Sequence, residues 1–233
     1  MVAVLKRELK SYFNNPIGYI ILAFFTFFAS IAFSKLYFAG VPSIESVISE
    51  TVSAAIFATP FITMRLLSED RRQKVDQVLL TAPVKISAIV LGKFFAAFSL
   101  YAAGFFSTLI FQFIVAARVS LNWRIYFYAL FGALLLGAVM ISIGMFLSSL
   151  TESPVVSAVL TFAVFLTVML PMLIAQLTGS KSAEIISKAV SFIDRFSNFI
   201  TGVFSLNDVI YMLSITGVFV FLTVCSVAKR RWA

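Results

Sequence analysis

The chain alternates between long stretches without charged residues and short groups of Lys, Arg, Asp and Glu. Five uncharged stretches contain at least 20 residues each, at positions 11–34, 94–117, 125–151, 153–180 and 209–228. A helix of about 20 apolar residues crosses the hydrocarbon core of a bilayer, so each stretch predicts one membrane span. The chain therefore has the pattern of an all-α polytopic membrane protein.

A sixth span is expected at residues 48–67, although its uncharged part, 51–64, is short and contains Pro60. Length alone would also allow a re-entrant or buried segment here. We place a span because Arg65 can extend its guanidinium to the membrane surface. In addition, an even number of spans puts most of the basic residues on one side of the membrane. This span is the least suited to contact lipid all round. Together the six expected spans cover residues 16–36, 48–67, 92–117, 125–147, 154–178 and 208–228.

The basic residues predict the orientation in the membrane. With six spans, 12 of the 18 Lys and Arg residues lie on the side that holds both termini. Because short cytoplasmic loops are enriched in Lys and Arg, we expect both termini in the cytoplasm and one transmembrane domain over residues 1–233. A cleaved signal peptide is the alternative for the first span, but the apolar run is long and reaches Lys35 without a clear cleavage site.

Composition excludes several functions. The chain is 61% hydrophobic and 12% charged, with a mean hydropathy of +1.03, whereas a soluble domain carries about 25% charged residues. The net charge of +8 comes from small groups between apolar runs, not from a polar basic surface that would bind nucleic acid. Without His and with a single Cys, the chain lacks imidazole catalysis, a His-ligated metal and an internal disulfide.

The chain also lacks the phosphate-binding loop of an ATPase. Its Gly-Lys pair, Gly92-Lys93, is followed by Phe94, and Ser87 stands where the first glycine of the loop should be. We therefore expect no ATP hydrolysis by this mechanism and no cofactor on this chain.

Two segments outside the spans have one apolar and one polar side at helical spacing. Residues 2–14 predict an interfacial helix that lies flat before the first span. Residues 184–204 predict a second amphipathic helix, interfacial or re-entrant, on the external face. The apolar side of this second helix includes Phe196, Phe199 and Ile200.

The loop between the second and third spans predicts a short helix at residues 68–80. It has a capping residue at Ser68, acids at Glu69 and Asp70 in the first turn, and an apolar stripe of Val75, Val78 and Leu79. Pro83 ends it, because the residue before a proline avoids the helical region. Such a helix is suited to dock into a groove on another protein. A loop that only sets orientation would explain the arginines but not the apolar stripe.

The run KRELKSYFNNPIGYI, the loop RLLSEDRRQKVDQVLLTAPVKISAIVLGK and the spacing of six spans resemble those of type-2 ABC exporter permeases, closest to the gliding-motility and copper-maturation subgroup. The resemblance covers nearly the whole chain. It implies a separate cytoplasmic ABC ATPase that holds ATP and Mg, and a second permease copy, identical or not. It also implies an extracytoplasmic accessory subunit in some members and a location in the bacterial inner membrane.

The resemblance assigns roles to four groups of residues. The ATPase-coupling group contains Ser68, Glu69, Asp70, Arg71, Arg72, Val75, Val78 and Leu79. A second cytoplasmic contact at 148–153 contains Ser149, Thr151 and Glu152. The translocation path contains Glu50, Ser53, Phe57, Phe61, Phe162, Phe165 and Met169, although Glu50 would also fit a carboxylate at the headgroup level. The external gate contains Phe196, Phe199 and Ile200, with Gly202 or Asn207 as a bend.

Two other functions stay open. A secondary transporter or channel would need no ATP, and only Pro60 and Pro171 hint at the broken spans that such proteins use. A non-transporting scaffold would anchor an ATPase without a substrate. The sequence does not identify a substrate, and its apolar lining favours an amphipathic or lipid-linked molecule over a small ion.

Overall fold

The computed structural model describes residues 1–38, 44–73, 85–116, 123–178 and 191–229. All its regular elements in these ranges are helices. They are α1 (Val2–Asn14), α2 (Pro16–Phe38), α3 (Ile44–Thr63), α4 (Ser68–Arg72), α6 (Ile86–Phe106), α7 (Thr108–Ala116), α8 (Trp123–Leu150), α9 (Pro154–Thr178), α11 (Phe192–Ile200) and α12 (Leu206–Lys229).

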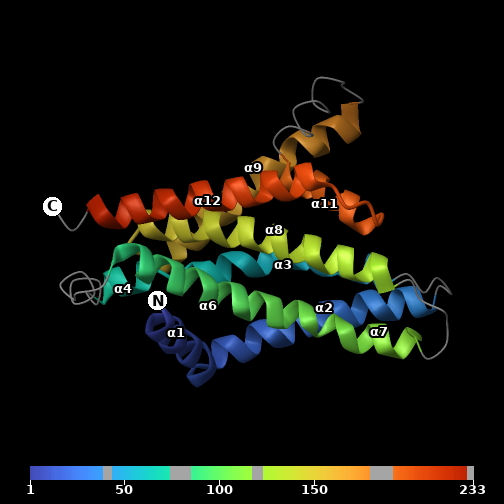
Figure 1. The fold of residues 1–233 in the computed structure, drawn as a ribbon, viewed down its shortest axis with the longest axis horizontal. Coiled ribbons are helices and arrows are strands. Elements are labelled where there is room, and N and C mark those ends of the chain that lie inside the picture. The colour runs from blue at the N-terminus through green and yellow to red at the C-terminus, as the bar shows by residue number, and fades with distance from the viewer. Residues whose placement is uncertain (39–43, 74–84, 117–122, 179–190, 230–233) are drawn as a thin grey trace.

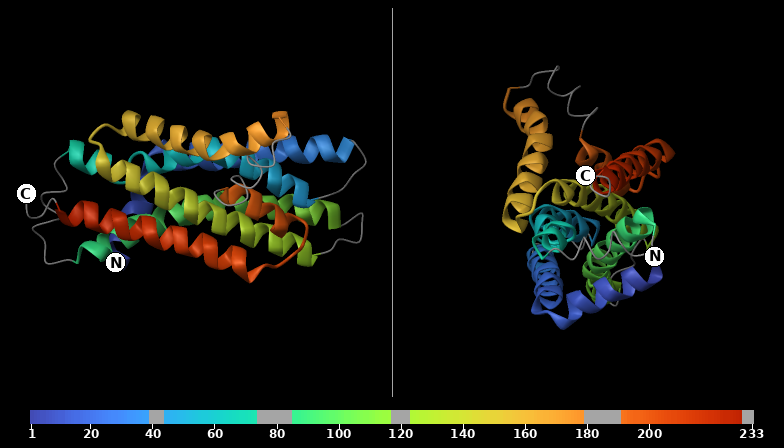
Figure 2. Two further views of the ribbon diagram at one scale, coloured as in Figure 1. Left: turned by 90° about the horizontal axis from the view of Figure 1, so that it is seen from above. Right: turned by 90° about the vertical axis from the view of Figure 1, so that its left-hand side faces the viewer.

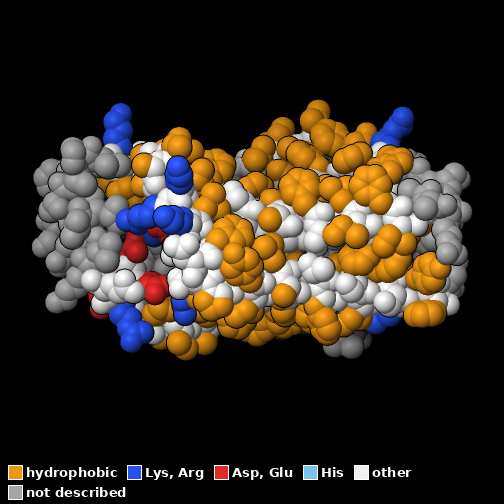
Figure 3. All heavy atoms as spheres, turned by 90° about the horizontal axis from the view of Figure 1, so that it is seen from below, with side chains coloured by type: hydrophobic (Ala, Val, Ile, Leu, Met, Phe, Trp, Pro, Cys, Tyr) orange, Lys and Arg blue, Asp and Glu red, His pale blue; other side chains and the backbone are white. Residues whose placement is uncertain are grey.

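Within the described residues, six helical segments are long and apolar enough to cross a membrane, which agrees with the expected number of spans. They form an elongated bundle in which α1, α4 and the end of α12 lie at one end (Figure 1). The C-terminal end of α2 and helix α7 lie at the other end (Figures 1 and 2). We call the first end the α1–α4 end. On the face that carries α1, most of the charged side chains gather at the α1–α4 end, and the rest of that face is largely apolar (Figure 3).

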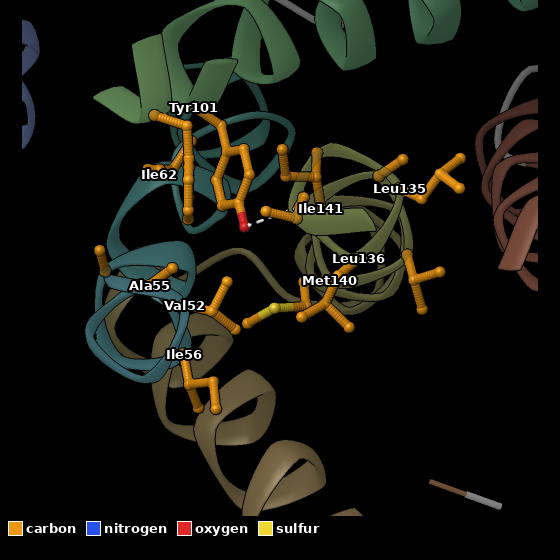
Figure 4. Packing of buried hydrophobic residues seen from close by; sticks show 14 of the residues in the cluster. Val52, Ala55, Ile56, Ile62, Tyr101, Leu135, Leu136, Met140 and Ile141 are labelled. Carbon is orange, nitrogen blue, oxygen red and sulfur yellow. Dashed lines mark hydrogen bonds between the residues drawn. The ribbon is translucent and has the colours of Figure 1, made fainter. Parts of the chain in front are cut away.

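Helices α8 and α3 form the centre of the bundle. In the most hydrophobic stretch of each span, 78% of the residues of α8 and 67% of those in the α3–α4 span are buried, against 12% for α9 and 11% for α12. Val52 of α3 points toward Met140 of α8, and Ile62 of α3 lies next to Tyr101 of α6 (Figure 4). The expectation that the second span is the least suited to face lipid is wrong in its ranking, because the fourth span, α8, is buried more fully, although α3 also packs on several neighbours.

Glycines in α8 let its neighbours approach closely. An added Cβ at Gly137 would lie 2.1 Å from the ring of Tyr101, and one at Gly144 would lie 2.3 Å from Oγ1 of Thr63. Small residues allow this close helix packing in membranes. The Tyr101 hydroxyl also donates to the Ala133 carbonyl at 3.2 Å (Figure 4), so α6 and α8 are joined by both shape and a hydrogen bond.

Several boundaries differ from those expected. The third span does not begin at residue 92, because α6 already begins at Ile86 and places Lys93 inside the helix. This span continues as α7 after a break at Ser107, whose N–H bonds the Gly104 carbonyl. Helix α9 of the fifth span, Pro154–Thr178, has the expected bounds, and α1 and the start of α2 at Pro16 also match.

The two helices expected outside the spans are described only in part. Helix α4 covers Ser68–Arg72 of the predicted range 68–80, and Val75, Val78 and Leu79 lie outside the described residues. Helix α11 covers Phe192–Ile200 of the predicted range 184–204, of which residues 184–190 lie outside the description.

Candidate functional site

Helix α4 is capped by a serine from another helix. The expectation that Ser68 caps it is wrong, because Leu67 occupies the cap position and the Ser68 hydroxyl donates to the Met64 carbonyl. Instead, the Ser148 hydroxyl of α8 accepts the N–H groups of Leu67 at 3.2 Å and Ser68 at 3.1 Å. It also donates to the Met64 carbonyl at 3.2 Å. A hydroxyl offers one donor and two acceptor positions, so Ser148 uses its full capacity to fix the start of α4.

Arg71 joins α4 to the turn between α8 and α9. Its guanidinium donates to the Leu150 carbonyl at 3.2 Å and lies 2.8 Å from the Glu152 carboxylate. The second predicted contact, 148–153, is therefore attached directly to the first. Within it, Thr151 bonds the Ser153 carbonyl, whereas Ser149 is buried and bonds Ser226 of α12 at 3.0 Å. Ser149 thus packs inside the chain rather than on its surface.

A buried lysine connects α4 to two further helices. The Lys93 ammonium lies 2.8 Å from the Asp70 carboxylate of α4 and 3.1 Å from the Glu8 carboxylate of α1, and the Lys93 side chain is 1% exposed. We call Glu8, Asp70 and Lys93 the Lys93 clamp. Burying a charge is costly unless it is paired, so the clamp fixes α1, α4 and α6 to one another. The neighbouring Gly92 lies against the Val4 side chain, and the Gly92-Lys93 pair therefore serves helix packing.

The pKa values of two side chains of α1 at the clamp are shifted. Burial raises the pKa of Glu8, but Lys93 and Arg7 lower it by more, so the pKa of this carboxyl lies below its ordinary value of 4.5. Burial and the nearby Glu8 and Glu69 carboxylates raise the pKa of Tyr12. Its protonated hydroxyl donates to the Ile62 carbonyl of α3 at 3.1 Å. Helix α1 is thereby bonded to both α3 and α6.

The remaining polar side chains of α4 face outward. Arg72 and Gln73 are exposed, and Glu69 lies 3.8 Å from the Arg65 guanidinium. Between α4 and the start of α9 is a hollow of about 410 Å³, lined by Arg72, Ser153 and neighbouring residues. Both predicted cytoplasmic contacts border this hollow.

Helix α3 exposes one narrow stripe along its length. Glu50, Ser53, Phe57 and Phe61 are exposed at helical spacing, whereas nearly all residues between them are buried. The structure therefore brings four of the predicted path residues onto one face. Glu50 lies at the end of the bundle opposite α4 and is 3.8 Å from the ammonium of Lys35, with both side chains exposed.

Helix α9 contributes to the same face. The rings of Phe57 and Phe162 lie 5.5 Å apart between their centroids, and Met169 is half-buried. Phe165, in contrast, is 1% exposed and packs in the core. The predicted path residues thus form a shared surface of α3 and α9 from which Phe165 is excluded in this conformation.

The predicted external gate packs against α8. Phe196 and Phe199 of α11 are buried and Ile200 is partly buried. An added Cβ at Gly132 would lie 2.6 Å from the Phe199 side chain, so the glycine makes room for this ring. Gly202 has φ of +79°, a value that favours glycine, and of the two predicted bends it forms the turn between α11 and α12.

A second buried ionic group joins α11 to α12. Asp208 accepts from Arg195 at 2.9 Å and from Asn198 at 2.8 Å, and the Arg195 guanidinium lies 3.9 Å from the centre of the Tyr211 ring. We call these four residues the Asp208 cluster. It holds the end of the bundle opposite α4.

Sequence reasoning missed both ionic groups and Ser148. It placed Lys93 and Asp208 at the limits of spans, whereas Lys93 lies about two turns inside α6 and Asp208 in the first turn of α12. The uncharged residues 86–92 before Lys93 were a usable signal, because they extend the apolar helix on its other side. Nothing in the sequence pairs Ser148 with Leu67.

Comparison with known proteins points to one family. The family model for the ABC-2 type transporter matches residues 1–172. The matched range contains α1, α4, the Lys93 clamp and the turn between α8 and α9, and it ends within α9. No curated protein matches the sequence.

Proposed function

Because the chain belongs to the ABC-2 type transporter family of membrane permease components, we propose that it is the multi-pass permease subunit of an ATP-driven exporter. A separate cytoplasmic ATPase binds ATP and Mg and supplies the energy. The α1–α4 end of the bundle then faces the cytoplasm of a bacterial inner membrane. The gliding-motility and copper-maturation subgroup, and the accessory subunit of some of its members, are finer predictions from the sequence.

The observation that carries this proposal is the joined pair of contact segments. Arg71 bonds Leu150 and Glu152, and α4 and the start of α9 border one hollow of about 410 Å³. A partner that inserts a side chain or loop there would contact both segments at once. The exposed Arg72 of α4, the exposed Gln73 directly after it and the exposed Glu152 are available for this contact.

Movement of α4 reaches several spans through named contacts. Ser148 transmits it to α8, and Lys93 transmits it to α6 and to α1. Since packed interfaces switch between discrete arrangements rather than deforming continuously, these helices move largely as a unit. A partner acting on α4 therefore acts on much of the bundle.

The exposed stripe of α3 and the adjoining α9 then form the surface toward a second permease copy and the path between them. Glu50 and Ser53 supply polar groups at the external end, and Phe57, Phe61 and Phe162 supply an apolar middle. In this conformation α11 covers α8 with Phe199, as an external gate in its closed state would.

Co-purification tests the proposal. The full-length tagged chain is expressed in its source cells, solubilised from membranes, and its partners are identified by mass spectrometry. We expect a soluble protein with a phosphate-loop motif in a stoichiometric amount. The variant Arg72→Glu, which reverses an exposed charge on α4, should lose most of this partner.

The control variant is Lys35→Glu, which reverses an exposed charge at the opposite end of the bundle and should retain the partner. Purification of the wild-type chain without any ATPase would contradict the proposal. Equal retention by Arg72→Glu and by Lys35→Glu would remove α4 from the interface. A reporter fused after Ala233 that reads as external would reverse the proposed orientation.

A further inference from the structure

A second pocket lies on the other side of Glu69, where α1 meets α3 and α4. It has a volume of about 390 Å³, within the range of about 300 to 1,000 Å³ that is typical of small-molecule sites. Arg7 and Ser11 of α1 and Asn15 directly after it line one part of the pocket, and Arg65 and Glu69 line it from the α3–α4 side. The predicted coupling group supplies Glu69 and Asp70 and the predicted path supplies Phe61, but neither role assigns a ligand to this space.

The pocket is lined by both polar and apolar side chains. Ile17, Phe61 and Leu66 line it together with the charged residues. Phe61 is 58% exposed and belongs to the stripe that continues along α3 into the membrane-spanning part of the bundle. Helix α1 lies across the bundle end, and α2 begins directly after it (Figure 1). The pocket thus lies where a membrane surface would meet its hydrocarbon core.

The charged side chains that line the pocket differ in how many partners they already have. Glu8 and Asp70 also line it, but both bind Lys93 behind it. The Arg7 guanidinium donates one hydrogen bond to Glu8 at 2.7 Å and has further N–H donors. Glu69 accepts a hydrogen bond from Gln73 through Oε1 at 3.2 Å, and its other carboxylate oxygen, Oε2, lies 3.8 Å from Arg65, which is longer than a hydrogen bond. Two guanidinium groups and one carboxylate can therefore turn to a ligand.

We propose that this pocket binds one glycerophospholipid with a zwitterionic headgroup that carries a primary ammonium. Arg7 and Arg65 hold the phosphate, because guanidinium groups bind phosphate oxygens through several directed hydrogen bonds. Glu69 accepts from the ammonium. The glycerol and the first methylenes lie on Phe61 and Ile17, and the acyl chains continue into the membrane. The lipid would also stabilise the junction of α1 with α4, since it binds both.

Native mass spectrometry of the full-length protein tests this site. The protein is purified in detergent, delipidated, and titrated with phosphatidylethanolamine or phosphatidylglycerol. We expect the wild-type chain to retain one phosphatidylethanolamine more strongly than phosphatidylglycerol. Arg65→Gln should lower retention of both lipids about tenfold, which corresponds to one charge-assisted hydrogen bond. Glu69→Gln should remove only the preference for phosphatidylethanolamine.

Lys35→Gln is the matched control, because it removes an exposed cation at the far end of the bundle, and its retention should equal that of the wild type. Ser11→Phe fills the pocket from α1 without changing a charge and should also abolish the bound lipid. Unchanged retention in Arg65→Gln or Ser11→Phe would overturn the proposal, as would equal retention of the two lipids by the wild type. The assay contains no ATPase, so its outcome is separate from that of the proposed coupling.

Discussion

The two ends of the bundle each contain a buried ionic group, but the two groups connect the chain in different ways. The Lys93 clamp joins Glu8, Asp70 and Lys93 from three helices that are far apart in the sequence. The Asp208 cluster joins α11 only to the helix that follows it. The first group makes separate spans move together, whereas the second stiffens one local turn and leaves α11 attached to α8 mainly by apolar packing.

The largest expected effect is at the clamp. Lys93→Met leaves two carboxylates without their shared cation, and we expect the free energy of unfolding to fall by about 3 kcal/mol, as for other broken buried ion pairs. Unfolding in mixed detergent micelles measures it. Adding Glu8→Gln and Asp70→Asn should recover most of the loss, because no unpaired charge then remains. A triple variant as unstable as Lys93→Met would contradict the electrostatic explanation.

The matching change at the other end should cost less and act locally. Asp208→Asn removes the charge that Arg195 binds, but the Arg195 side chain is 27% exposed and can turn to water. We expect a loss of about 2 kcal/mol. Hydrogen exchange should rise in α11 and at the start of α12 only, whereas Lys93→Met should raise it in α1, α4 and α6. If the increase in hydrogen exchange extended over equally many helices in both variants, the two ionic groups would not differ in how they connect the chain.

Loss of the tertiary cap on α4 should have a smaller effect. Ser148→Ala removes an acceptor of two N–H groups, and we expect a loss of about 1 kcal/mol. Amide exchange at Leu67 and Ser68 reports it directly. Ser214→Ala is the control, because the exposed Ser214 hydroxyl bonds only the Ile210 carbonyl of its own helix among the contacts described, and it should leave both amides unchanged.

The smallest expected effect is a loss of stability at acidic pH, where Glu8 of the clamp becomes protonated. The pKa of Glu8 in the folded chain lies below 4.5, so its ionised form stabilises the fold. This contribution is complete above pH 4.5 and is lost as the pH falls through the lower folded-state value. We expect it to be smaller than the three effects above, because burial opposes the lowering of the Glu8 pKa by Lys93 and Arg7. Unfolding measured across this range should show a weaker pH dependence in Glu8→Gln than in the wild type, and identical curves would contradict it.

The sequence predicted the spans well because a single requirement dominates them. Each must carry enough apolar residues to cross the membrane, and charges between spans mark their approximate limits. Pro16 placed the start of α2 correctly for a local reason, since proline fits the first turn of a helix. The even number of spans also placed both ends of the described chain at one end of the bundle (Figure 1).

The contacts between spans were predictable only in part. Helical spacing put Phe57 and Phe61 on one face of α3, and the structure keeps them exposed. The same spacing could not show that Phe165 is covered by the core, because that depends on which neighbour packs there. The cap by Ser148 and the clamp at Lys93 join residues about 80 positions apart, and helical periodicity carries no information at that separation.

The fit of Tyr101 against Gly137 limits how the third and fourth spans can shift relative to each other. The ring occupies the space that a Cβ would take, and its hydroxyl bonds the carbonyl one turn earlier on α8. Axial sliding of α6 by one residue would press the ring into a neighbouring side chain and break that bond. The two helices therefore cannot slide along each other, but their crossing angle can still change about this contact.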